Sequence, residues 1–235
     1  MSICAGCHAG CCRSFAVPLS GADVLRIERD RGASFWDFAC RWEDSQGVIA
    51  GRYAPHFHFD DEPETPFAIC LQHVPSATMP GSTRCQFLNE ESPSTEFPRG
   101  RGSCGAYSHR PAACRVFPTT LHDSGLLAVI EPVPSCRREG HPEAYALCPR
   151  PWTPEDIDPV QSVQDLVIAK FEMQFFHVVA SRWNRQPGAW ADFPQFLRIV
   201  YEHRVMTRDA DEIHAELPAA VPFESLSKRR QSRAA

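Results

Sequence analysis

The distribution of cysteine constrains this chain more than any other feature of its sequence. Eleven of the 235 residues are cysteine, and none of them lies beyond Cys148. Such a density indicates either disulfides in an oxidising compartment or thiolates that hold metal in a reducing one. The first residues, Met1 to Cys4, have neither the positive charge nor the apolar run of a secretory signal. We therefore expect a cytoplasmic protein whose cysteines bind metal.

Composition narrows the range of partners. The formal net charge is −5 and the sequence pI is about 6.1, which argues against general affinity for nucleic acid. No stretch reaches the roughly 18 consecutive apolar residues that a membrane span requires. We expect metal ions as partners, with room for a protein partner, and neither nucleic acid nor a membrane.

The end of the cysteine-rich part suggests how the chain is organised. Two prolines in Cys148-Pro149-Arg150-Pro151 would stop any regular element. The sequence predicts a cysteine-cluster metal-binding domain over residues 1–148, a helical extension over 149–226 and a disordered basic tail over 227–235. The expected fold class is α+β: a small irregular domain stapled by metal, with a C-terminal helical pair.

Capping and hydropathy signals predict the elements of the first part. Ser20 with Asp23 predicts a helix start and Gly32 its end, and Ser34 with Asp37 repeats the signal before Gly47. The second helix would place Phe35, Phe38, Ala39 and Trp42 on one face.

Two further regions of the first part read as strands. The apolar run 67–71, within 65–74, suits a buried strand, and 116–121 with 126–133 would form a hairpin around the turn 122–125. Residues 75–84 and 89–103 are rich in Pro, Ser, Gly and Glu and read as loops.

The last part of the chain reads as two helices. A 3.6-residue period predicts a long helix with a buried face formed by Val160, Val163, Val167, Phe171, Phe175, Val178 and Val179. A second helix is expected to begin at Asp192 and to bury Phe196, Leu197, Val200 and Val205.

The first candidate ligands are Cys4, Cys7, Cys11 and Cys12. Two residues separate Cys4 from Cys7, which lets both thiolates reach one ion while the backbone turns around it. Gly6 and Gly10 would provide the permissive backbone of that turn. Because adjacent side chains usually point apart, we expect Cys11 and Cys12 to serve two neighbouring sites, or one site and the core.

Four more cysteines complete the candidate set, namely Cys85, Cys104, Cys114 and Cys136. Together they make eight thiolates, the number that two four-coordinate centres require. Cys40 and Cys70 fall within apolar elements and are predicted to be small core residues, whereas Cys148 is left unassigned.

The spacing of these residues resembles that of a known family. Cys4-x2-Cys7-x3-Cys11-Cys12, Cys85-x-Phe87-Leu88 and Cys104-x2-Tyr107-x2-Arg110-Pro111-x2-Cys114-Arg115-x-Phe117-Pro118 are similar to the YkgJ-type cysteine-cluster family, also called CxxCxxCC. Three residues instead of two precede the Cys-Cys pair here. The resemblance runs from Cys4 to about Cys136 and implies chelation of zinc or iron; flagellin N-methylase is a member of this family.

The sequence leaves the metal open. Zinc favours sites built from two Cys-x2-Cys pairs, of which this chain has one, whereas iron–sulfur clusters accept scattered cysteines. Arg110 and Arg115 could offset thiolate charge or bind surface carboxylates. His109 is a reserve ligand. The alternation of His56, His58 and Asp60 suits an ordinary strand better than a mononuclear site.

Three functions follow from this interpretation. The first is a structural or redox metal protein. The second is an iron–sulfur-dependent enzyme such as a protein-lysine N-methylase, which rests on analogy with the flagellin methylase because no S-adenosylmethionine signature is evident. The third is an adaptor that binds a protein through residues 150–235. Whether the chain is an enzyme stays undecided at this point.

Overall fold

A ten-residue strand, β3 (Glu62–Leu71), organises the larger sheet of the computed structural model. The structure describes residues 9–50, 53–97, 100–121, 126–129 and 154–206. Strand β3 lies between β1 (Ala39–Glu43) and β2 (Phe57–Phe59), and both neighbours run antiparallel to it. Its residues 67–71 are buried, which confirms the strand predicted from the apolar run.

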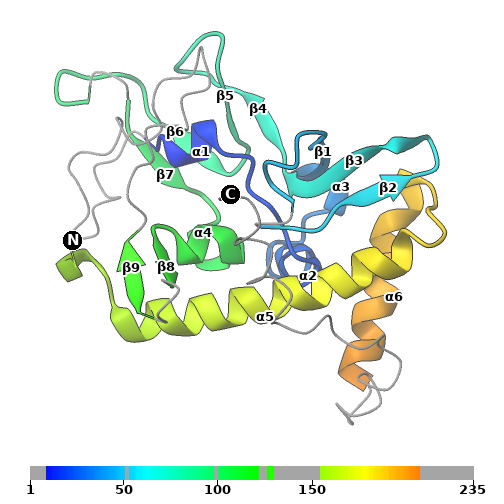
Figure 1. Cartoon of the computed structure of the whole chain (residues 1–235). Helices are drawn as coiled ribbons and strands as arrows, with labels where there is room; N and C mark the ends of the chain where they lie inside the picture. The colour runs from blue at the N-terminus through cyan, green and yellow to red at the C-terminus, as the bar shows by residue number, and fades with distance from the viewer. Residues whose placement is uncertain (1–8, 51–52, 98–99, 122–125, 130–153, 207–235) are drawn as a thin grey trace, which may run out of the picture.

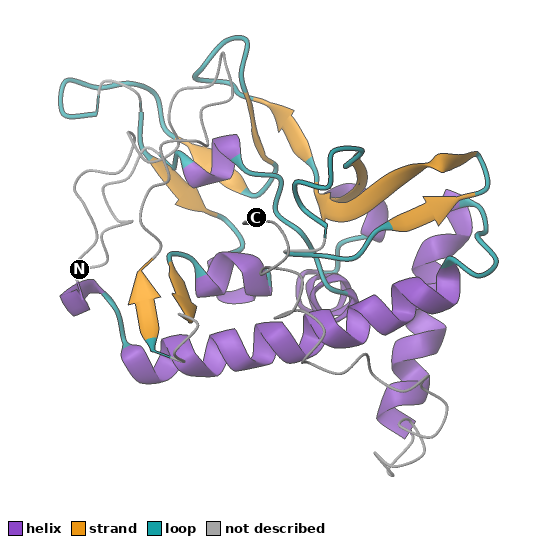
Figure 2. Ribbon diagram, in the orientation of Figure 1, coloured by secondary structure: helices purple, strands orange, loops and turns teal. Residues whose placement is uncertain are grey.

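Three two-stranded ribbons accompany this sheet in the described part of the chain (Figure 2). They pair β4 (His73–Pro75) with β5 (Thr83–Cys85), β6 (Leu88–Glu90) with β7 (Gly102–Cys104), and β8 (Thr119–Leu121) with β9 (Leu127–Val129). The last pair confirms the predicted hairpin, whose turn lies outside the described residues. The prediction of loops over 75–84 and 89–103 was therefore only partly correct, because β5, β6 and β7 overlap the ends of these segments. Each of these strands has three residues, too few for a periodic pattern to reveal.

In the described part of the chain, five α-helices precede the C-terminal one. They are α1 (Cys11–Ser14), α2 (Gly21–Arg31), α3 (Phe35–Phe38), α4 (Ala112–Val116) and α5 (Pro159–Trp183). Helix α6 (Phe193–Met206) then follows a short 3₁₀ turn. The result is a mixed α+β fold with small antiparallel sheets and two C-terminal helices, as predicted.

The capping signals were correct for α2 and only partly so for α3. Ser20 and Asp23 form a capping box, and Gly32 ends α2 in the left-handed conformation. Ser34 and Asp37 also form a capping box, but α3 ends after one turn. The prediction of a helix up to Gly47 was wrong because residues 39–43 pair with β3 instead. Strand pairing thus overrides a helical pattern of apolar residues.

Helices α5 and α6 pack against the cysteine-rich part within one hydrophobic core (Figure 1). Phe57 and Phe59 of β2 contact a group of rings from the helical part, namely Phe176, Trp183, Trp190 and Phe193. The indole of Trp183 also donates to the carbonyl of His58, at 2.7 Å. The end of α5 is therefore anchored on the sheet.

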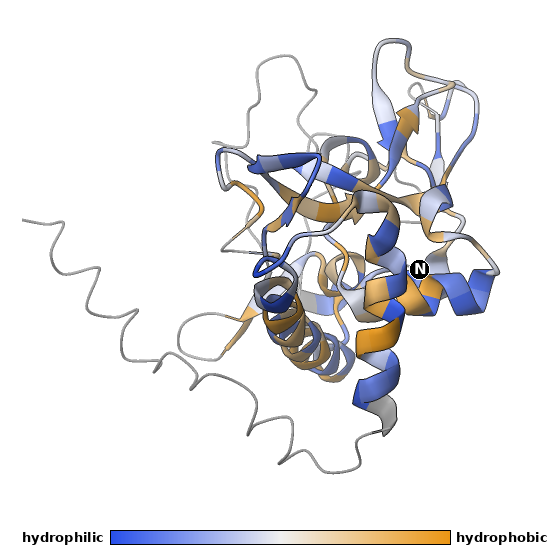
Figure 3. Ribbon diagram, turned by 90° about the vertical axis from the view of Figure 1, so that its right-hand side faces the viewer, coloured by the Kyte–Doolittle hydropathy of each residue, from blue (hydrophilic) through white to orange (hydrophobic). Residues whose placement is uncertain are grey.

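The predicted buried face of α5 was wrong in its first half. Val160, Val167 and Phe171 are 66%, 57% and 60% exposed, whereas Phe176 and Val179 are buried. The side of α5 that bears Asp165 faces α4 instead. The valines of the predicted face therefore lie on the exposed side of the helix. Figure 3 shows apolar and polar residues along both C-terminal helices. In α6, Leu197 is buried as predicted, with Phe196 and Val200 partly buried.

None of the described helices, α5 included, has an apolar stretch sufficient to span a lipid bilayer. The predicted division at residue 148 and the predicted tail over 227–235 fall on residues outside the described ranges and stay predictions.

Candidate metal centre

Five of the eight candidate ligands lie in the described part of the chain. They are Cys11, Cys12, Cys85, Cys104 and Cys114, and they come from four separate segments. The other three candidates, Cys4, Cys7 and Cys136, lie outside the described residues, as does Cys148. None of the seven described cysteines, which include Cys40 and Cys70, is joined in a disulfide.

Cys11 and Cys12 begin the one-turn helix α1. The left-handed residue before this turn is Ala9, with φ of 55°, whereas Gly10 is right-handed with φ of −56°. The expectation that Gly10 supplies the permissive backbone was therefore wrong. The two side chains also do not point apart, because their Sγ atoms lie 3.9 Å apart. Two thiolates on one tetrahedral zinc would be separated by about 3.8 Å, given Zn–S bonds of about 2.3 Å. The pair thus does not require two ions.

Cys85 and Cys104 end two strands of neighbouring ribbons. Leu88 pairs directly with Cys104 in the β6–β7 ribbon. The N–H of Gly105 donates to the carbonyl of Phe87, at 2.7 Å, which fastens the segment after Cys104 to the segment after Cys85. Backbone hydrogen bonds therefore hold the two strand ends together.

Gly102 lets the segment before Cys11 approach the β6–β7 ribbon closely. A Cβ atom at Gly102 would lie 2.5 Å from the Cβ of Ala9 and 3.0 Å from a methyl group of Leu88. The turn before Cys11 consequently packs on β7 at a point where only glycine fits.

Cys114 lies on α4, which begins directly after Pro111. The buried carboxylate of Asp23 on α2 accepts from the N–H of Ala112, at 3.0 Å. Arg26 pairs with the same carboxylate at 2.7 Å and donates to the carbonyl of Arg110 at 2.8 Å. Asp23, which is part of the capping box of α2, thereby also fixes the first turn of α4.

The described thiols share one electrostatic neighbourhood. Burial, then the charges of Cys11, Cys85 and Cys104, raise the pKa of Cys114 well above its usual range. The hydrogen bond between Cys12 and Cys11, followed by burial, also raises the pKa of Cys12. Burial above all raises the pKa of Cys85 to about 11. Cys12 and Cys114 also pack against the core cluster that contains Cys85. Metal binding at such thiols must release protons.

This neighbourhood is not a complete coordination sphere. Within the residues that the structure describes, no three side chains of His, Cys, Asp or Glu are arranged so that they could hold an ion. The chemistry of the donors nevertheless fits zinc or iron, because thiolates are the soft ligands that both zinc and iron–sulfur clusters accept.

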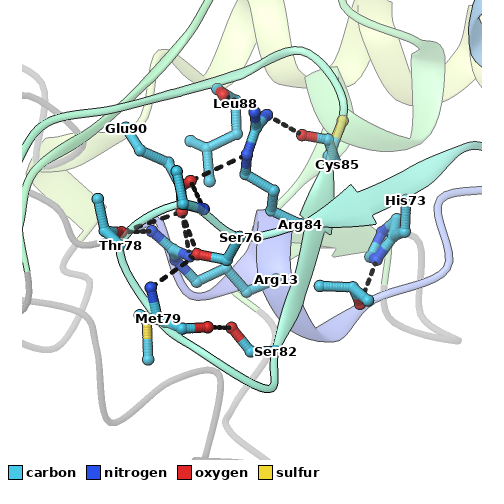
Figure 4. A network of polar contacts seen from close by, with 12 residues as sticks. Arg13, His73, Ser76, Thr78, Met79, Ser82, Arg84, Cys85, Leu88 and Glu90 are labelled. Carbon is cyan, nitrogen blue, oxygen red and sulfur yellow. Dashed lines mark hydrogen bonds and ion pairs between the residues drawn. The ribbon is translucent and has the colours of Figure 1, made fainter.

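Arginine side chains fix the backbone around the cysteines, a role that the sequence did not reveal. Nη1 of Arg84 donates to the carbonyl of Cys85, at 3.2 Å (Figure 4). It also donates to the carbonyls of Gln86 and Leu88, at 3.3 and 2.6 Å. Arg31 donates to the carbonyl of Gly105, at 2.8 Å. Arg26 is tied in the same way through the carbonyl of Arg110, and only structure can pair an arginine with a distant carbonyl.

Arg110 and Arg115 have different surroundings. The charge of Arg110 lowers the pKa of Cys114, against the larger effect of burial, and its guanidinium stacks on Tyr107 at 4.0 Å. Nε of Arg115 instead faces the carboxylate of Asp165 on α5, at 3.9 Å. The partner of Arg115 is thus a buried carboxylate and not one at the surface.

The remaining candidates have other partners. His56 contacts the buried Asp44 at 3.0 Å, His58 the carbonyl of Pro63 at 2.9 Å, and His109 the carboxylate of Asp30 at 3.3 Å. The interpretation of the histidine run as an ordinary strand fits β2. Cys70 is fully buried in β3 opposite Cys40 in β1, as small core residues would be.

Comparison with known proteins agrees with this geometry. Residues 3–137 match the family CxxCxxCC, described as "Putative zinc- or iron-chelating domain". No curated protein and no solved structure matches the chain. Because the match spans more than half of its length, the chain belongs to the CxxCxxCC family of cysteine-rich zinc- or iron-chelating domains.

Proposed function

We propose that the chain is a metal protein whose cysteines chelate an iron–sulfur cluster or zinc, in a structural or redox role. The observation that supports it most is that five cysteines from four segments, none of them in a disulfide, lie within range of one another's charge. Burial and mutual repulsion keep these thiols protonated without metal. A bound cation would offset the charge of their thiolates and displace the protons.

The proposed ligands are Cys4, Cys7, Cys11, Cys12, Cys85, Cys104, Cys114 and Cys136. Of these, Cys11 and Cys12 have sulfur atoms at a separation suited to one tetrahedral ion. Zinc would supply structural stability, and an iron–sulfur cluster could in addition carry an electron.

A comparison of two single variants tests this proposal. In Cys114→Ser a candidate ligand on α4 is lost, whereas Cys40→Ser removes a half-buried thiol outside the neighbourhood. Metal per chain is measured by elemental analysis of anaerobically purified protein, together with its absorption near 400 nm, where iron–sulfur clusters absorb. We expect the wild type and Cys40→Ser to hold the same amount of metal and Cys114→Ser to lose part or all of it. Equal metal in all three proteins would contradict Cys114 as a ligand.

An enzymatic role is the second candidate and rests on the family alone. Flagellin N-methylase belongs to the same family, so an iron–sulfur-dependent methylase is the activity to assay. Transfer of labelled methyl groups from S-adenosylmethionine to a partner protein would establish it.

A further inference from the structure

A buried carboxylate, Glu90, connects the segments that carry the cysteines. Its side chain is 3% exposed and lies at the end of β6. Five groups contact its two oxygen atoms: Oγ of Ser76 at 2.5 Å, N–H of Ala77 at 2.8 Å, Oγ1 of Thr78 at 3.1 Å, Nη1 of Arg13 at 2.5 Å and Nε of Arg84 at 3.0 Å. Figure 4 shows the carboxylate between the two guanidinium groups.

The two arginines bring different cysteines to this carboxylate. Arg13 directly follows Cys12 on α1, and its side chain is 4% exposed. Arg84 directly precedes Cys85 and also donates to the carbonyl of that residue. The strand of Glu90 pairs with β7, which ends at Cys104. One carboxylate therefore joins the segments of Cys11 and Cys12, Cys85, and Cys104.

The energetics of this hub favour a single arrangement. A buried guanidinium without its anion is costly, so Arg13 and Arg84 stay in place only while Glu90 is ionised. Burial opposes ionisation, but hydrogen bonds from Ser76 and Ala77 and the contact with Arg13 hold the pKa of Glu90 at about 2. The two guanidiniums and one carboxylate leave one positive charge next to thiols that become negative when they bind metal.

We infer that Glu90 is a positioning residue that gathers three cysteine-bearing segments before any metal binds. Metal then enters a site whose segments are already in place, in contrast to a chain that folds only around its ion. This inference rests on the proposed metal-binding function, which the test below examines separately.

The test compares metal-free, reduced wild type with Glu90→Gln, which keeps the shape of the side chain and removes its charge. Asp44→Asn is the matched control, because Asp44 is also a buried carboxylate and accepts from the N–H groups of Val48, Ile49 and Ala50, none of which flanks a candidate ligand. Each protein is first checked by far-UV circular dichroism and is then titrated anaerobically with Co²⁺, whose thiolate charge-transfer band reports cysteine ligation.

We expect Glu90→Gln to weaken Co²⁺ binding by about tenfold or more, the scale found for groups that orient metal ligands. Asp44→Asn should lower the melting temperature and leave Co²⁺ affinity near that of the wild type. A folded Glu90→Gln protein with wild-type affinity and band intensity would overturn the inference. Should Glu90→Gln not fold, Ser76→Ala, which removes one contact to the hub, decides the matter: we expect weaker Co²⁺ binding, and unchanged binding would overturn the inference.

A second readout separates the inference from the proposed function. The absence of any charge-transfer band in the wild type would contradict metal binding by cysteine and leave the role of Glu90 to be judged without metal. For that purpose diamide takes two electrons and two protons from a pair of neighbouring thiols, forming a disulfide and a hydrazine. Mass mapping should show disulfides among Cys11, Cys12, Cys85 and Cys104 forming faster in the metal-free wild type than in Glu90→Gln. Equal rates would contradict the gathering role.

Discussion

Glu90 and Asp23 each tie a cysteine-bearing segment to another part of the fold through several short contacts. Glu90 binds the segments around Cys12 and Cys85, and Asp23 binds the first turn of the helix that carries Cys114. Both carboxylates are buried, and both accept from backbone N–H groups as well as from arginine. The positions of the thiols thus depend on carboxylates, which are not the ligands that soft metals prefer.

The pKa of Glu90 makes a pH dependence of stability predictable. Its pKa in the folded protein is about 2, below the usual value of 4.5, so ionised Glu90 stabilises the folded state. That contribution is fully present above pH 4.5 and is lost as the pH falls from there toward 2.

Urea unfolding at a series of pH values measures this effect. The free energy of unfolding of the wild type should fall through that window more steeply than that of Glu90→Gln, which has no carboxylate to protonate at this position. Parallel curves for the two proteins would show that Glu90 is not ionised in the buried network.

The elements show where local sequence signals suffice. The capping box and terminal glycine of α2 define that helix at both ends, and five consecutive apolar residues define the buried part of β3. The one-turn helix α3 and the exposed valines of α5 could not be predicted, because pairing with β3 and the position of Asp165 decide them. Both depend on contacts between residues far apart in sequence.

The contact between α2 and α6 gives a prediction at this scale. A Cβ atom at Gly21, the first residue of α2, would collide with the ring of the buried Tyr201 on α6. Gly21→Ala should therefore lower the free energy of unfolding by about 1–3 kcal/mol, the usual cost of overpacking a core.

A double-mutant cycle checks the cause of this loss. In a Tyr201→Ala background the ring is absent, so adding Gly21→Ala should cost little or even stabilise the helix. The same cost in both backgrounds, measured by denaturant unfolding, would mean that the ring of Tyr201 is not what Gly21 accommodates.

At the scale of the whole molecule, the spacing of the cysteines proposes which of them are ligands but not how they are held. Of the proposed ligands, Cys11, Cys12, Cys85, Cys104 and Cys114 lie in the described part of the chain, where electrostatic interactions link them. The sequence could not reveal that Arg26, Arg31 and Arg84 fix the backbone near the cysteines, since hydrogen bonds to carbonyl oxygens leave no residue pattern. Nor could it give the close sulfur pair of Cys11 and Cys12.

The helical part belongs to the same account. Helices α5 and α6 complete the hydrophobic core on which the cysteine-bearing segments rest, and α4, which carries Cys114, packs directly on α5. The metal neighbourhood is therefore supported by apolar burial as well as by polar contacts, and we expect a folded core in metal-free protein.

The most direct test of the central claim is a count of metal and thiols in the same anaerobic preparation of the full chain. Elemental analysis gives zinc and iron per chain, and thiol titration in denaturant, before and after reduction, distinguishes thiolates from disulfides. The account predicts stoichiometric zinc or iron together with all eleven cysteines as thiols. A preparation free of both metals, with cysteines such as Cys85 and Cys114 joined in disulfides, would contradict it.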